Sequence, residues 1–385
     1  MENAEQLICK LLRGELVAWP GAVERADVSR FIELLRFHGV ATLVGRGLSN
    51  APNESWPAEI LDYCRGQTLA QAVSVMTGRV ELARLLRGFA DAGIKPLLLK
   101  GASLAYSHYG NPVLRPRGDT DLLIPPHSRR SAEDVLRRLG YAPSLQMAGE
   151  FISYQANWAY RDRLGVIHDL DLHWRVNNSQ VLAKLLDYEE LAARAAVVPE
   201  LGANAYALVP VHALLFACMH LAGHRNAPLY LDGIAYPAGA RLIWLYDIHL
   251  LVCAMARTEL EEFAALAVRK RMASICRDAL VRGAECFQTQ IPESILERLS
   301  PAGAAEPSAR YCKAGPAWQI VDDVIALDGA GARARFLGEM VFPSAAYMRG
   351  KYEGAVVSWL PLLYVRRALH AVWKLAASRL VSARD

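Results

Sequence analysis

The chain has 385 residues, which is enough for two or three domains or for one catalytic core with large additions. Hydrophobic residues make up 53% of it, so the composition supports a sizeable buried core and excludes global disorder. The 43 basic and 39 acidic residues leave a net charge of +4, which is too mild to indicate nucleic-acid binding, and we expect no nucleic-acid partner.

Residues 1–92 are predicted to form an N-terminal helical region. Leucines and phenylalanines recur there at helical spacing, and Gly93 is a typical helix-ending residue after an amphipathic stretch over residues 67–92. The first residues include early acids and no uninterrupted apolar segment, so they do not resemble a secretory signal. Nowhere do about 18 apolar residues run together, and the 7 cysteines form no CxxC pair. These features predict a cytoplasmic protein with no integral membrane segment.

Residues 93–178 are predicted to form a small mixed-sheet core. Short apolar runs indicate strands and longer amphipathic stretches indicate helices, in the order strand, helix, strand, helix, strand, strand. The expected boundaries are 95–100, 102–109, 119–124, 128–139, 150–160 and 166–174. This order is typical of an α+β unit and differs from a repeated doubly wound sheet.

Residues 179–385 are predicted to form a C-terminal helical region, which makes the protein predominantly α overall. The segments 211–221, 241–256 and 259–276 have the length and pattern of helices. Residues 226–240 hold two prolines and two glycines, and we expect a surface loop there that could cover a site.

Two carboxylates on one predicted strand are the first candidates for chemistry. Asp119 and Asp121 are separated by one residue, so their side chains share a face, about 7 Å apart along the strand. A surface turn carrying two acids is the alternative, but these two lie in an apolar strand where unpartnered acids are costly. Hard divalent ions such as Mg²⁺ favour such oxygen ligands, and a pair of ions can stabilise both oxygens of a displacement at phosphorus.

A third carboxylate is expected on the strand at residues 166–174. Asp169, Asp171 and His173 alternate with Leu170 and Leu172, so the three polar side chains point to one face. Asp171 is the better candidate because apolar residues flank it, and Asp169 is the second choice. For His173, a structural hydrogen bond is favoured over a catalytic role.

A phosphate-binding element is predicted upstream of the carboxylates. Lys100 and Gly101 end one strand and begin a helix, where glycine lets backbone N–H groups approach a phosphate and the helix N-terminus favours anions. Lys100 can reach toward a triphosphate. Arg115 could add a second contact, because arginine suits bidentate phosphate binding.

These segments resemble a known family. The sequence LLLKGASLAYSHYGNPVLRPRGDTDLLI followed by DLDLHWRV is similar to the polymerase-β-type nucleotidyltransferases, and more narrowly to bacterial nucleotidyltransferase family proteins found in exopolysaccharide and lasso-peptide gene clusters. The resemblance implies a nucleotidyltransferase core and extends through most of the chain. The superfamily's usual Gly-Ser pair is Gly101-Ala102 here, with Ser103 one residue later, and its third acid, often Glu, is Asp171.

Two histidines in the C-terminal region are further candidates. His220 and His224 lie four residues apart on a predicted helix, so they share a face. The glutamate of the HExxH zinc motif is absent between them. They either pack between helices or face the catalytic cleft with Arg225, contacting nucleotide phosphates or deprotonating the acceptor. Asp247 is a candidate to orient one imidazole.

The residues and the resemblance together predict a Mg²⁺-dependent nucleotidyltransferase. Asp119, Asp121 and Asp171 are expected to hold two Mg²⁺ ions. The expected donor of the NMP group is an NTP, and ATP is the preferred candidate. The expected acceptor is a hydroxyl or phosphate of a peptide, protein or sugar phosphate, and a biosynthetic peptide is one candidate. Two alternatives are transfer of a phosphoryl or glycosyl group by the same site, and a non-catalytic nucleotide-binding module. The three acids argue against the second alternative.

Overall fold

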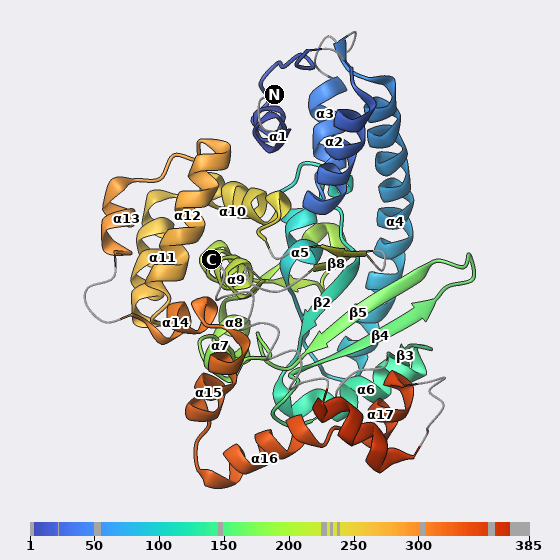
Figure 1. Cartoon of the computed structure of the whole chain (residues 1–385), viewed down its shortest axis with the longest axis vertical. Helices are drawn as coiled ribbons and strands as arrows, with labels where there is room; N and C mark the ends of the chain where they lie inside the picture. Colours follow the sequence, from blue (N-terminus) through green and yellow to red (C-terminus); the bar gives the residue numbers. More distant parts are fainter. Residues whose placement is uncertain are drawn as a thin grey trace.

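The computed structural model describes most of the chain. The described residues are 4–21, 23–49, 55–144, 149–224, 229–231, 234–236, 239–300, 305–352 and 359–369. Within them, helices surround a mixed β-sheet (Figure 1), and the expected predominantly helical α+β fold is confirmed. Every described helix is too short or too polar to cross a membrane.

The sheet has seven strands in the order β3-β4-β5-β2-β1-β7-β6. The β2–β5 and β1–β7 pairs are parallel and the other pairs are antiparallel. The strands are β1 (Leu97–Leu98), β2 (Asp119–Leu123), β3 (Ala142–Pro143), β4 (Gln155–Arg161), β5 (Ile167–His173), β6 (Ala196–Val197) and β7 (Tyr206–Ala207).

Four helices precede the sheet, as predicted for residues 1–92. They are α1 (Ala4–Leu12), α2 (Arg25–His38), α3 (Ala41–Ser49) and α4 (Ala58–Asp91). Within the sheet region, α5 (Lys100–Ser107) follows β1, the short 3₁₀ turns Pro112–Leu114 and Pro126–Ser128 flank β2, and α6 (Arg129–Arg138) follows the second turn.

The C-terminal region is mostly helical, also as predicted. Its helices are α7 (Gln180–Ala183), α8 (Tyr188–Arg194), α9 (Pro210–His224), α10 (Leu242–Ala254), α11 (Arg257–Arg269), α12 (Ala273–Phe287), α13 (Glu293–Arg298), α14 (Pro307–Lys313), α15 (Pro316–Ala326), α16 (Ala330–Val341) and α17 (Ala345–Lys351), with a 3₁₀ turn at Pro199–Leu201. Figure 1 shows α10 to α13 gathered on one side of the molecule and α15 to α17 below the sheet.

Three features differ from the sequence expectation. The C-terminal region contributes β6 and β7 to the sheet, which the helical pattern of residues 179–385 did not predict. The segment 226–240, expected to be a loop, contains the two-stranded sheet of β8 (Leu229–Leu231) and β9 (Ile234–Tyr236). The first predicted strand shrinks to β1 because Lys100, with a φ of 50°, already begins α5.

The two faces of the central sheet pack against different cores. Leu122 and Ile124 join a cluster with α4 and α6, which includes Leu86 and Val135. Leu123 joins the larger cluster, which unites α1–α3 with α9–α12. Because side chains alternate along a strand, the carboxylates of β2 share the face of Leu123 and point toward α9 and α10.

Candidate functional site

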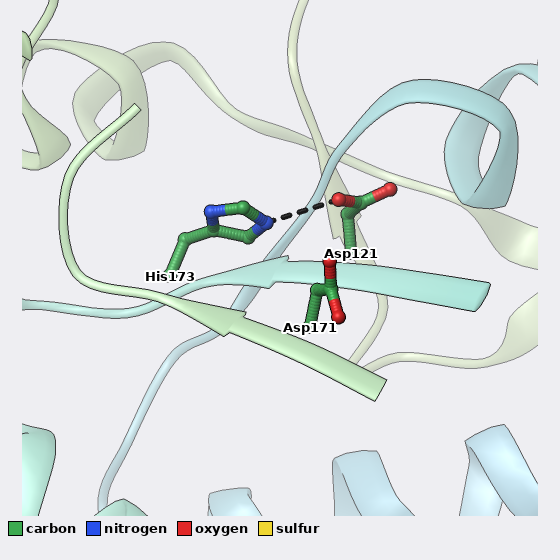
Figure 2. A group of neighbouring side chains, drawn as sticks. All are labelled: Asp121, Asp171 and His173. Atoms are coloured by element: carbon green, nitrogen blue, oxygen red, sulfur yellow. Dashed lines mark hydrogen bonds and ion pairs between the residues drawn. The ribbon is translucent and has the colours of Figure 1, made fainter. Parts of the chain in front are cut away.

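The parallel pairing of β2 with β5 brings two carboxylates together. In the register of this pair, Asp121 lies opposite Asp171, and neighbouring strands are about 4.8 Å apart. Figure 2 shows Asp121, Asp171 and His173 side by side at this point. One potential ligand atom from each of the three lies within 4.8 Å of the others. Asp171 and His173 therefore share a face of β5, as predicted.

Asp121 is the most enclosed of the carboxylates. It is only 3% exposed, and its Oδ1 atom accepts a hydrogen bond from Lys100 Nζ at 2.6 Å and faces His173 Nε2 at 3.0 Å. Burial alone would raise the pKa of Asp121, but the Lys100 ammonium and His173 outweigh that effect and hold the pKa below its ordinary value. Asp121 is therefore ionised at neutral pH.

The pKa values of the neighbouring carboxylates, Asp119 and Asp171, are raised above their ordinary values. Asp119 is exposed at the start of β2, but the surrounding protein and the charges of Asp121 and Asp171 raise its pKa to about 7. Burial and Asp121 likewise raise the pKa of Asp171, although Asn157 and Gln155 of β4 donate hydrogen bonds to it. A divalent cation would relieve this repulsion and favour the ionised forms. Among the described residues, Asp121, Asp171 and His173 form the group whose ligand atoms lie close enough for one ion, and Asp119 as a further ligand stays a prediction.

The start of α5 lies beside the carboxylates. At Gly101, a Cβ atom would lie 3.0 Å from Cζ of Arg115, so glycine allows the close passage of this guanidinium and a larger residue would press against it. Lys100 precedes it with its ammonium on Asp121, and Ser103, one turn further, is buried against the same cavity. Lys100 and Gly101 thus begin a helix beside the carboxylates, at the position that the sequence predicts.

Arg115 is held in a buried ion pair. Its Nε and Nη2 atoms donate to Oδ1 and Oδ2 of Asp247 at 2.8 and 2.7 Å, and its Nη1 donates to the Pro116 carbonyl at 2.6 Å. Tyr109 donates its hydroxyl proton to Oδ1 of Asp247 at 2.7 Å. The expectation that Asp247 orients a histidine is therefore wrong, because its two oxygens accept hydrogen bonds from Arg115 and Tyr109 instead.

Two arginines that the sequence did not single out also border the site. Arg117 and Arg241 line the same cavity as the carboxylates. Nη1 of Arg117 is buried, and within the described part of the chain it has no hydrogen-bond partner. Burial lowers the pKa of both guanidinium groups, that of Arg241 to about 10. The sequence could have indicated Arg117 as a residue of this site, because it lies two residues before Asp119.

The two histidines of α9 face this site. The ring centroids of His220 and His224 are 4.5 Å apart, and those of His220 and Trp244 are 4.9 Å apart. Loss of hydration and the Lys100 ammonium lower the pKa of both imidazoles, so they are neutral at neutral pH. Arg225, predicted beside them, lies outside the described residues.

Nine of the predicted site residues line one cavity. Its volume is about 410 Å³, within the range of small-molecule sites. The predicted residues on its wall are Lys100, Gly101, Ser103, Arg115, Asp119, Asp121, Asp171, His220 and His224. Asp169, the second choice for the third acid, does not line it. The cavity combines carboxylates that suit a cation with cationic groups that suit phosphates.

Comparison with known proteins gives a family match over most of the chain. A family described as uncharacterised nucleotidyltransferase matches residues 24–288. Among solved structures, an antigenic nucleotidyltransferase-like protein from Paracoccidioides brasiliensis matches 57% of this chain and 96% of its own, with 13% sequence identity and a TM-score of 0.34. No curated protein matches the chain.

Proposed function

This chain belongs to the family of uncharacterised nucleotidyltransferases. We propose that it transfers a nucleoside monophosphate from a nucleoside triphosphate to a hydroxyl or phosphate of an acceptor, with AMP as the preferred candidate for the transferred group. The observation that carries the proposal is the register of β2 with β5, which sets Asp121 beside Asp171 at the wall of a cavity lined by cationic side chains. Carboxylates and cations so arranged suit displacement at phosphorus.

In this proposal, Asp119, Asp121 and Asp171 hold two Mg²⁺ ions. When bound, Mg²⁺ would neutralise charge on the triphosphate and polarise its α-phosphorus. His173 orients Asp121 through the 3.0 Å contact between Nε2 and Oδ1. An imidazole nitrogen is a poorer ligand than oxygen for Mg²⁺, so the orienting role is preferred for His173.

The triphosphate is assigned to the cationic side of the cavity. Lys100 is the first contact, because its ammonium can move from Asp121 to a phosphate once a cation balances that carboxylate. Arg117 is the second, because its buried Nη1 has no partner among the described residues. Gly101 contributes backbone at the start of α5. Arg115, fixed by Asp247, supplies positive potential, with Ser103, His220 and His224 around the bound nucleotide.

The chemical step balances without a further reactant. The acceptor oxygen forms a bond to the α-phosphorus, the bond from that phosphorus to the β-phosphate oxygen breaks, and pyrophosphate leaves. Asp171, which lies opposite Asp121 on the neighbouring strand, accepts the acceptor's proton. Positioning and fixed charges account for most of the expected rate increase.

Titration of Mg²⁺ and a non-hydrolysable ATP analogue tests the proposed site. Wild type is expected to bind the analogue in a Mg²⁺-dependent manner, and Asp121→Asn to bind it at least about tenfold more weakly. Asp169→Asn is the matched control and should bind like wild type. Equal affinity in wild type and Asp121→Asn would contradict metal-mediated nucleotide binding here.

Mass spectrometry of the modified acceptor identifies the transferred group. An adduct with the mass of a nucleoside monophosphate supports the proposal. A bare phosphate or a hexose would instead support the second candidate, in which the same site transfers a phosphoryl or glycosyl group.

A further inference from the structure

A second cavity adjoins the one that holds the carboxylates. Its volume is about 510 Å³, and it shares Lys100, Gln155, Phe216, His220 and His224 with the first cavity. His173, which contacts Asp121, lines it as well. The two cavities therefore share part of their walls next to the carboxylates, and an acceptor in the second cavity would lie beside a nucleotide bound in the first.

The wall of the second cavity mixes apolar side chains with polar ones. Ile152, Val176, Phe216, Ile320, Phe336 and Met340 contribute apolar surface. Side-chain amides, which both donate and accept hydrogen bonds, are interspersed with these residues and come from Gln155, Asn177, Asn178 and Gln319. Apolar surface with scattered amides suits a peptide-like molecule whose own amide groups need partners.

The charged groups on this wall are already paired. Apart from histidines and Tyr311, the ionisable residues that line the described cavity are Lys100 and Asp323. Lys100 pairs with Asp121, and in the proposed function it pairs with the triphosphate of the donor. Oδ1 of Asp323 accepts from Ser179 Oγ at 2.9 Å and from the Gln180 backbone N–H at 2.7 Å. An anionic acceptor would therefore lose hydration without gaining a free cation.

One side of this cavity lies beyond the part of the chain that the family matches. The match ends at residue 288, whereas Gln319 and Ile320 belong to α15, and Phe336 and Met340 belong to α16. These helices are fixed to the core. Asp323 of α15 holds the start of α7, and Glu339 of α16 accepts from the backbone N–H groups of residues 150 and 151 at 3.0 and 2.9 Å. The core thus supplies the reaction, and α15 and α16 shape the pocket beside it.

We propose that the second cavity is the acceptor site and that it takes an uncharged, hydroxyl-bearing peptide segment with apolar side chains. The inference rests on the proposed nucleotidyl transfer. The peptide hydroxyl enters beside Lys100 and His173, and its oxygen forms the new bond to the α-phosphorus while pyrophosphate leaves. The helices α15 and α16 select the peptide, because they supply Gln319, Ile320, Phe336 and Met340.

A pooled library of capped tripeptides tests the acceptor class. Each peptide carries a central serine or tyrosine, with apolar flanks in one half of the pool and acidic flanks in the other, and glucose 1-phosphate is added as a small anionic acceptor. With MgATP and wild type, peptides with apolar flanks should gain the nucleotide at least about tenfold faster than the acidic ones. Preference for acidic peptides or for glucose 1-phosphate, or no modification of any apolar peptide, overturns the proposal.

Two substitutions on one helix sharpen the test. Gln319→Lys places a cation in the cavity. It should lower the ratio of the transfer rate to apolar peptides over the rate to acidic peptides by about tenfold. Trp318→Lys adds the same charge one residue away, on a side chain that is 69% exposed, and should leave the preference unchanged. Equal effects of the two changes would show that charge acts through the general field of the protein and would overturn the cavity assignment.

A blocking variant separates this proposal from the proposed function. Ile320→Trp should slow transfer to the apolar peptides by about tenfold or more while leaving the affinity for the Mg²⁺-bound ATP analogue unchanged. Normal peptide transfer by Ile320→Trp contradicts the acceptor site alone. Nucleotide binding that does not depend on Asp121 contradicts the proposed function itself.

Discussion

Two aspartates on one face of β5 provide the most discriminating comparison at the scale of single residues. Asp171 lines the candidate cavity and lies opposite Asp121, whereas Asp169 lies opposite Asp119 and outside that cavity. Asp171→Asn should lower kcat/KM for nucleotidyl transfer by about 10³-fold, because it removes a cation ligand and the proposed base. Asp169→Asn should stay within a few fold of wild type. Steady-state kinetics with the same acceptor measure both, and equal losses would contradict the assignment.

The buried pair of Arg115 and Asp247 is expected to matter for stability. Asp247→Ala leaves a guanidinium that is 7% exposed without its partner, so the free energy of unfolding should fall by about 3–5 kcal/mol. Urea unfolding followed by circular dichroism measures the change. The double substitution Arg115→Met with Asp247→Leu should recover most of the loss, because no unpaired charge remains. A double variant as unstable as Asp247→Ala would contradict this explanation.

Single-residue roles were predictable where the signal was local. The spacing of Asp119 and Asp121 and the alternation around Asp171 predicted which side chains share a face, and the register of β2 with β5 agrees. The pairing of Arg115 was not predictable, because its partner Asp247 lies 132 residues away and neither residue carries a local sign of the other. The contact between His173 and Asp121 depends in the same way on which strands are neighbours.

The longer elements were predictable and the shortest were not. The strands β2 and β5, with five and seven residues, carry a clear alternation of polar and apolar side chains. By contrast, β6 and β7 have two residues each, and β7 pairs with β1 more than 100 residues earlier in the chain. Two residues cannot show a period, so nothing local distinguished these strands from the helical sequence around them.

Helix α16 should depend on Glu339 for its attachment to the core. This carboxylate accepts from two consecutive backbone N–H groups, at Glu150 and Phe151. Glu339→Ala should therefore speed amide hydrogen exchange in the segment 149–151, by about tenfold. Hydrogen exchange followed by mass spectrometry measures the effect, and Glu339→Gln, which keeps an acceptor oxygen, should show a smaller change. Unchanged exchange in Glu339→Ala would show that other contacts hold this segment.

The larger of the two cores of the described structure crosses the predicted regional boundaries. The cluster on the cavity side of the sheet draws residues from α1–α3, from β1 and β2 and from α9–α12. The regions 1–92, 93–178 and 179–385 remain a prediction, but their side chains pack together at this core. The N-terminal and C-terminal helices therefore help to position β2 and β5. In the proposed function, substitutions in these helices can alter activity even where they do not contact the cavity.

Acid should destabilise the folded protein through His38, which joins α2 to the start of α10. Its Nδ1 accepts from the Leu242 backbone N–H at 3.2 Å, and burial, with a contribution from Arg241, lowers its pKa from 6.5 to about 4. The unfolded chain therefore binds more protons between these two pH values, so the free energy of unfolding falls as the pH decreases from about 6.5 toward 4.

The size of the effect can be measured by comparison with His38→Asn, which keeps an acceptor for Leu242 but does not titrate. Between pH 7 and pH 5, wild type should lose about 2 kcal/mol more of its free energy of unfolding than the variant. Urea unfolding at the two pH values gives the difference. Parallel losses in the two proteins would assign the acid sensitivity to other groups.

Phosphate labelling tests the central claim most directly. Wild type is incubated with Mg²⁺, the acceptor peptides and ATP labelled at either the α- or the γ-phosphorus. The account predicts that the α-label enters the acceptor and the γ-label leaves in pyrophosphate, that Asp169→Asn behaves like wild type, and that Asp171→Asn loses the transfer. Entry of the γ-label into the acceptor, or transfer of the α-label at an undiminished rate by Asp171→Asn, would contradict nucleotidyl transfer at this pair of strands.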